Sequence, residues 1–201
     1  MKVIVVTGGI GSGKSEACRF LSDEYGWPVY CADEKVKELY RKSPTLLPAI
    51  ESELGRSFRD NQGHFNPTAL ACVIFSDSTA LEKVESLVFP ELADDFAKWK
   101  HMHADSDWVI LESATILEKP QLKVLADITV VVDAPVALRE QRALLRDGGD
   151  VSDVRRRMQA QPLMNDISNE VISAPADYRI VNASTLSDFN EKLQNLAQEI
   201  R

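Results

Sequence analysis

Near the start of the chain, glycines, a lysine and a hydroxyl side chain are spaced as phosphate binding requires. Residues 8–15 read GGIGSGKS and match the pattern G-x-x-x-x-G-K-[ST] at every position. The glycines of this pattern let the backbone curl so that its N–H groups face a phosphate. Lys14 would reach the β- and γ-phosphates, and the Ser15 hydroxyl would bind Mg²⁺ directly. The alternative is a glycine-rich turn that merely connects two elements.

The segments on either side of this motif favour the phosphate-binding interpretation. Residues 2–7 form a β-branched apolar run that predicts a buried parallel strand, and residues 16–21 predict a helix. A helix that begins at the motif adds its partial positive charge to the phosphate site. We name residues 8–15 the P-loop. The residues expected to bind the nucleotide there are Gly9, Ile10, Gly11, Ser12, Gly13, Lys14 and Ser15.

Asp33 is the candidate for taking a proton from an acceptor hydroxyl. It follows the expected strand 28–31, and ligands of open α/β sheets bind at the carboxyl ends of strands. A carboxylate at that edge could act as a general base. An N-cap for the following helix is an equally good interpretation, and the two roles are compatible.

Two further carboxylates follow expected strands. Glu112 comes after strand 108–111, and Asp133 ends strand 128–133. Either could hold a water molecule bound to Mg²⁺, and Glu112 is favoured if its strand lies beside residues 2–7. Asp133 precedes Ala-Pro and could instead cap a helix.

Arginines crowd into one stretch of an otherwise acidic chain. Beside a P-loop they indicate a polyphosphate ligand, and the glycines at 148 and 149 are typical of a lid that closes. For any single arginine, a solvated helix face is the alternative. The arginines are Arg139, Arg142, Arg146, Arg155, Arg156 and Arg157.

Composition narrows the class of protein. The 201 residues, 44% apolar and 27% charged, suffice for one large core, or for one core with a smaller attached subdomain. No apolar run approaches the ~20 residues of a membrane helix, and the first strand leaves no room for a signal peptide. A net charge of −8 argues against nucleic-acid binding. The three scattered cysteines match no metal spacing. We therefore expect a cytoplasmic protein with no membrane or nucleic-acid partner.

Strands and helices alternate as in a doubly wound α/β fold. We predict a parallel five-stranded sheet flanked by helices, with its core at about 1–32, 104–135 and 174–201. A helical acceptor subdomain would occupy about 33–103, and a lid about 136–173. The expected strands are 2–7, 28–31, 108–111, 128–133 and 179–182. The expected helices include 33–43, 68–75, 78–103 with a kink at Pro90, and 186–201 capped by Ser184 or Thr185.

Among P-loop proteins, this organisation favours a small-molecule kinase. The chain has no Asn-Lys-x-Asp motif to read guanine and no Asp-x-x-Gly switch after the Mg²⁺ strand. Phosphoryl transfer needs a phosphate cradle, Mg²⁺, positive charge and a group that positions the acceptor.

Beyond these physical arguments, the sequence resembles the dephospho-CoA kinase family along nearly its whole length. The opening IVVTGGIGSGKS is similar to the family's first strand and P-loop, and Cys31-Ala32-Asp33 resembles its D-A-D motif. The other matching positions are Ile74-Phe75, Phe89-Pro90, Glu112, Glu118, Arg142, Arg146-Asp147, Gln161 and the strand Ala176–Asn182.

The resemblance implies a P-loop NTPase fold and transfer of the γ-phosphate of ATP to the ribose 3′-hydroxyl of dephospho-CoA, which completes coenzyme A synthesis. Asp33 would then be the catalytic base, and Lys14 with Arg142 and Arg146 would stabilise the transferring phosphoryl group. Asn182 would lie near the adenine. The implied acceptor contacts are Asp33, Phe89, Glu112 and Glu118. We expect a monomer or a weak homo-oligomer.

Four departures from the family pattern lie on the acceptor side. Cys31 replaces the first Asp of D-A-D, Pro67 an arginine, Phe89 the histidine of H-P, and residues 114–116 a P-L-L segment. They leave two alternatives open: a P-loop kinase for another nucleoside or small alcohol, and a degenerate paralogue that binds ATP without transferring phosphate.

Overall fold

The protein is described by a computed structural model over residues 1–116, 124–148, 150–159, 161 and 176–201. The chain forms two compact units, one made of Met1–Cys31 with His103–Arg201 and the other of Ala32–Met102. We name them the sheet unit and the helical unit.

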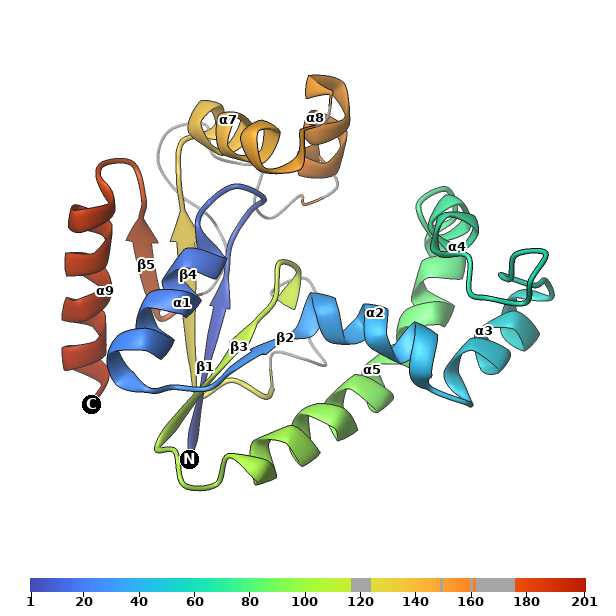
Figure 1. The fold of residues 1–201 in the computed structure, drawn as a ribbon, viewed down its shortest axis with the longest axis horizontal. Coiled ribbons are helices and arrows are strands. Elements are labelled where there is room, and N and C mark those ends of the chain that lie inside the picture. The colour runs from blue at the N-terminus through green and yellow to red at the C-terminus, as the bar shows by residue number, and fades with distance from the viewer. Residues whose placement is uncertain (117–123, 149, 160, 162–175) are drawn as a thin grey trace. The chain divides into compact units, whose positions relative to one another are not determined.

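The sheet unit is built on five parallel strands in the order β2-β3-β1-β4-β5 (Figure 1). The strands are β1 (Lys2–Thr7), β2 (Val29–Cys31), β3 (Trp108–Glu112), β4 (Ile128–Asp133) and β5 (Tyr178–Val181). Their near-continuous burial explains why they appear in the sequence as unbroken apolar runs rather than alternating ones. The prediction of a parallel five-stranded α/β sheet is confirmed.

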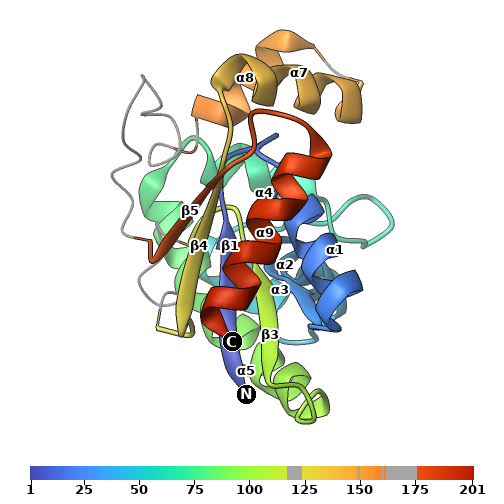
Figure 2. The same ribbon diagram turned by 90° about the vertical axis from the view of Figure 1, so that its left-hand side faces the viewer.

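Two helices, α1 (Lys14–Tyr25) and α9 (Leu186–Ile200), cover one face of this sheet (Figure 2). Gly26 ends α1 in the left-handed conformation, and its N–H donates to the Ser22 carbonyl. Thr185 is the N-cap of α9, because its side chain accepts from the Asp188 N–H. The core beneath them includes Ile4, Val6, Cys18, Leu21, Trp27, Trp108, Ile110, Val130, Val132, Phe189, Leu193 and Leu196.

Helices α7 (Val136–Asp147) and α8 (Val151–Gln159) lie beyond the carboxyl ends of the strands, on the side of the P-loop (Figure 1). They pack together through Ala143, Val154 and Met158, with Ile10 of the P-loop against this cluster. Gly148 ends α7 in the left-handed conformation. The neighbouring residue 149 and the later part of the predicted lid, 162–173, lie outside the described residues.

The helical unit contains α2 (Ala32–Lys42), α3 (Leu46–Leu54), α4 (Pro67–Ile74) and α5 (Ser78–Met102). Its core is formed by Leu46, Leu47, Ile50, Phe58, Leu70, Val84 and Val88. The sequence did not predict α3 as a separate helix. Pro48 lies in the first turn of α3, where the backbone N–H groups make no hydrogen bond within the helix, so a proline removes none. Helix α5 continues through Pro90. None of the helices described in the chain is long and apolar enough to cross a membrane.

Candidate active site

The P-loop connects β1 to α1 in a conformation that only glycine tolerates at several positions. Gly8, Gly11 and Gly13 have φ values of 150°, 75° and 107°. A Cβ at Gly8 would lie 2.1 Å from the Val132 carbonyl oxygen. The loop is therefore fixed both by its backbone angles and by close packing, as the motif predicts.

The loop presents the start of α1 together with a lysine. Gly13 is the N-cap of α1 and makes no side-chain capping hydrogen bond. The first-turn N–H groups of α1 are thus left without a side-chain cap, and they carry the positive end of the helix dipole. Lys14 Nζ donates to the Gly9 carbonyl oxygen at 3.2 Å, which places its charge over the loop. This combination suits a polyphosphate.

Ser15 and Glu112 meet at the carboxyl ends of the two central strands. Strand β3 pairs with β1, with Val6 opposite Glu112, and the Ser15 hydroxyl donates to Glu112 Oε1 at 2.8 Å. The condition under which Glu112 was favoured is therefore met. Hydroxyl and carboxylate oxygens are the ligand types that Mg²⁺ prefers. No group of three or more His, Cys, Asp or Glu side chains in the described ranges could hold a metal ion alone.

Asp133, the other Mg²⁺ candidate, has its carboxylate oxygens engaged in local contacts. Its Oδ1 accepts from the Ala134 N–H at 2.7 Å, and its Oδ2 forms a close ion pair with Arg179. The side chain is almost fully buried. These contacts tie the end of β4 to β5 and favour a structural role for Asp133.

Asn182 contacts the P-loop from the end of β5. Its Nδ2 donates to the Ser12 carbonyl oxygen at 2.9 Å, and a Cβ at Gly13 would lie 2.3 Å from the same nitrogen. Arg142 of α7 in turn donates to the Asn182 carbonyl oxygen at 3.2 Å and to its Oδ1 at 3.3 Å. Burial lowers the pKa of the Arg142 guanidinium. The structure thus brings Arg142 to the loop through Asn182.

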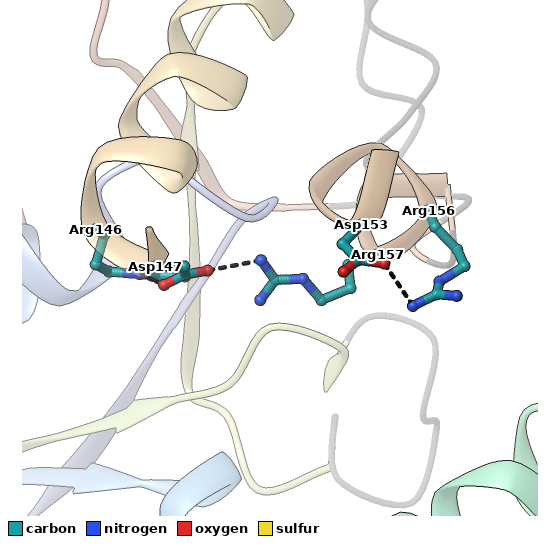
Figure 3. A network of polar contacts seen from close by, with 5 residues as sticks. All are labelled: Arg146, Asp147, Asp153, Arg156 and Arg157. Atoms are coloured by element: carbon teal, nitrogen blue, oxygen red, sulfur yellow. Dashed lines mark hydrogen bonds and ion pairs between the residues drawn. The ribbon is translucent and has the colours of Figure 1, made fainter. Parts of the chain in front are cut away.

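Arg146, the second lid arginine, belongs to a separate polar network (Figure 3). Its Nε and Nη2 donate to the two carboxylate oxygens of Asp147 at 2.7 and 3.1 Å, and Arg157 donates to the same carboxylate at 2.6 Å. The hydrogen bond from Arg146, followed by that from Arg157, holds the pKa of Asp147 well below its usual range. Arg146 is nonetheless 63% exposed.

Asp33 and Phe89 lie in the helical unit. Asp33 is the second residue of α2, so the alternative that it is the N-cap of this helix is wrong. An acidic residue in the first turn still favours the helix electrostatically. Cys31, which ends β2 two residues earlier, pairs in register with Glu112. Phe89 is half-buried in α5, and Glu118 lies outside the described residues.

The departure at Pro67 has a local structural reason. Asn66 caps α4 by accepting from the Ala69 N–H at 3.1 Å, and Pro67 takes the first helical position. A proline fits there because its fixed φ suits a helix start and no N–H is needed.

Two P-loop contacts were not assigned from the sequence. Arg139 Nε donates to the Ile10 carbonyl oxygen at 2.9 Å, and the Ile10 N–H donates to Gln161 Oε1 at 3.0 Å. Arg139 stood out as part of the arginine-rich stretch and Gln161 as a family match. Nothing local to either residue indicates that it contacts the loop.

Comparison with known proteins shows which family the chain is similar to. The family model described as dephospho-CoA kinase matches residues 2–188. A dephospho-CoA kinase of Porphyromonas gingivalis is 37% identical over 183 residues, covering 91% of this chain and 87% of that protein. One from Salinibacter ruber is 32% identical over 197 residues, covering 98% and 96%.

Solved structures show the same fold. The crystal structure of TT1252 from Thermus thermophilus matches this chain with a TM-score of 0.81 and 26% sequence identity. The match covers 100% of this chain and 98% of that one. Dephospho-CoA kinase from Campylobacter jejuni has a TM-score of 0.66 at 19% identity, with coverage of 100% and 98%, which supports the fold alone. From the family match and the two curated relatives, the chain belongs to the dephospho-CoA kinase family.

Proposed function

We propose that this protein transfers the γ-phosphate of ATP to the ribose 3′-hydroxyl of dephospho-CoA, giving coenzyme A and ADP. The observation that carries the proposal is the hydrogen bond from Ser15 to Glu112, formed where the P-loop meets the central strands. Family membership supplies the identity of the acceptor. The proposal includes a cytoplasmic location, where thiols stay reduced.

Each side chain has a distinct task in the proposed reaction. The P-loop amides and Lys14 bind the phosphates of ATP, and Asn182 lies near the adenine. Arg142 and Arg146 stabilise the negative charge on the transferring phosphoryl group. To do so, Arg146 must give up its hydrogen bonds to the Asp147 carboxylate and donate to phosphate oxygens instead. The exposed position of the Arg146 side chain permits this change of partner.

Ser15 and Glu112 have the oxygen donors that Mg²⁺ requires, Ser15 as a direct ligand and Glu112 through water. When bound, the ion neutralises charge on the β- and γ-phosphates. Magnesium therefore accompanies ATP in the proposal, and Ser15 and Glu112 are the residues that hold it.

Asp33 is proposed as the base. Its carboxylate accepts the proton of the 3′-hydroxyl as the new O–P bond forms and the bond from the γ-phosphorus to the leaving oxygen of ADP breaks. Glu112, Glu118 and Phe89 are the other proposed acceptor contacts.

The test compares Asp33→Asn with a matched control, Asp94→Asn, whose aspartate is 63% exposed on α5. ADP release is followed with Mg·ATP, with and without dephospho-CoA. We expect kcat to fall about 10²- to 10⁴-fold in Asp33→Asn, the usual scale for loss of a general base, with KM for ATP unchanged. The control should match the wild type.

Three results would contradict parts of this proposal. A kcat for Asp33→Asn close to that of the control would remove Asp33 as the base. Turnover with another alcohol but not with dephospho-CoA would favour a kinase for a different acceptor. ATP binding without any turnover would favour a degenerate paralogue.

A further inference from the structure

Arg139 in α7 is a buried charged side chain to which the proposed reaction gives no role. Among the residues that the structure describes, it is the largest that is fully buried, with 0% of its surface exposed. Burial lowers the pKa of its guanidinium, and the negative charge of Asp133 opposes that shift. Keeping an arginine in such a place is unfavourable unless its contacts compensate.

Those contacts are with the P-loop. Arg139 Nε donates to the Ile10 carbonyl oxygen at 2.9 Å. A Cβ at Gly9 would lie 1.9 Å from Arg139 Nη2, and one at Gly11 would lie 2.1 Å from the Arg139 carbonyl oxygen. One residue of α7 thus encloses three consecutive residues of the loop.

Gln161, which follows α8, completes the enclosure. Its Oε1 accepts from the Ile10 N–H at 3.0 Å. Both backbone polar groups of Ile10 are therefore satisfied by side chains, those of Arg139 and Gln161. The Ile10 side chain packs against the apolar cluster formed by α7 and α8.

We propose that Arg139 is a positioning residue for nucleotide binding, which holds Gly9–Gly11 in the conformation that receives the phosphates. A loop already ordered in its binding conformation loses less conformational entropy when the ligand arrives. The position of α7 is thereby coupled to the affinity for ATP. The inference rests on the proposed function only in taking ATP as the nucleotide.

The competing explanation is that Arg139 only fills the core beneath the loop. In that case its loss would lower the melting temperature of the protein but leave the ATP affinity of the folded protein unchanged. The two explanations differ in the Kd for Mg·ATP, which calorimetric titration measures without the acceptor.

The first experiment replaces Arg139 by alanine, with Arg19→Ala as the control because Arg19 is 60% exposed on α1. We expect the Kd for Mg·ATP to rise about tenfold or more in Arg139→Ala, the scale of a lost hydrogen bond from a charged group. Millimolar guanidinium should restore part of the affinity by occupying the space left, whereas urea should not. An unchanged Kd in folded Arg139→Ala would overturn the proposal.

A double-mutant cycle tests the contact with Gly9 directly. Gly9 does not have a positive φ, and the three atoms nearest to an added Cβ all belong to the Arg139 guanidinium. Gly9→Ala should therefore weaken ATP binding strongly in the wild-type background and much less in the Arg139→Ala background. Equal losses in the two backgrounds would contradict the assigned contact.

If Arg139→Ala does not fold, Arg139→Lys is measured in the same way. It keeps a positive charge and a donor, so its Kd should rise less than tenfold but measurably, and a wild-type Kd would overturn the proposal. If ATP binding changes as expected while dephospho-CoA is not phosphorylated, the proposed function fails and the role of Arg139 is supported.

Discussion

Replacing Asn182 by alanine tests how the P-loop is held from the side of β5. The change removes the hydrogen bond from Nδ2 to the Ser12 carbonyl oxygen at 2.9 Å. It also removes the Oδ1 atom that accepts from Arg142 at 3.3 Å. Ser12 is almost fully buried, so its carbonyl oxygen loses that donor where water does not readily replace it.

The expected loss follows from that buried carbonyl. Leaving one buried acceptor unsatisfied costs about 1–3 kcal/mol of the free energy of unfolding. In a protein of this size each kcal/mol lowers the melting temperature by about 2–4 °C, so we expect a decrease of about 2–12 °C. The affinity for Mg·ATP should fall as well, because Ser12 and Gly13 form the part of the loop that Asn182 contacts.

The assay is thermal unfolding followed by circular dichroism, with and without Mg·ATP. The matched control is Asn195→Ala on the exposed face of α9, where a surface substitution should change stability by no more than about 0.5 kcal/mol. Equal melting temperatures for the two variants would refute the reasoning, since Asn182 would then contribute no more than a solvent-exposed amide.

Two other predictions concern titration and reactivity. The carboxyl of Asp147 should titrate below the ordinary aspartate pKa of about 3.9, because Arg146 and Arg157 donate to it. Its contribution to stability is therefore complete above that value and is lost as the pH falls through the lowered pKa; a carbon-13 NMR titration with an ordinary midpoint would contradict this. Burial raises the pKa of the Cys18 thiol, so iodoacetamide at pH 8 should label the exposed Cys72 well before Cys18 in the folded protein, and mass spectrometry showing equal rates would disprove it.

Much of the sheet unit could be predicted because its signals are local. Buried parallel strands are continuous apolar runs, and all five predicted strands are found within two residues of their expected ends. The P-loop motif is contiguous, so its glycines, Lys14 and Ser15 could be assigned without knowing the fold. Helix α3 was not predicted as a separate helix; it contains Pro48, which a first-turn position tolerates.

The partner of Ser15 depended on strand order. Glu112 and Asp133 both end expected strands, and the sequence left both open as Mg²⁺ candidates. Pairing of β3 with β1 places Glu112 at 2.8 Å from the Ser15 hydroxyl, whereas Asp133 contacts Ala134 and Arg179. Such pairing joins segments about a hundred residues apart, which no local pattern specifies.

By itself, the sequence determined the α/β class, the phosphate-binding loop and the family resemblance, because these depend on contiguous residues and their periodicity. Only the tertiary structure separated Arg139 from Arg146. The two arginines lie two turns apart on one face of α7, so helix geometry alone does not predict that one is buried and the other exposed. The family resemblance assigned a role to Arg146 only. Arg139 is buried because the P-loop lies against it, and Arg146 stays exposed beside Asp147 in the last turn of the helix. What packs opposite a helix face, rather than the residue type, decides which arginine is buried against the loop and which stays exposed.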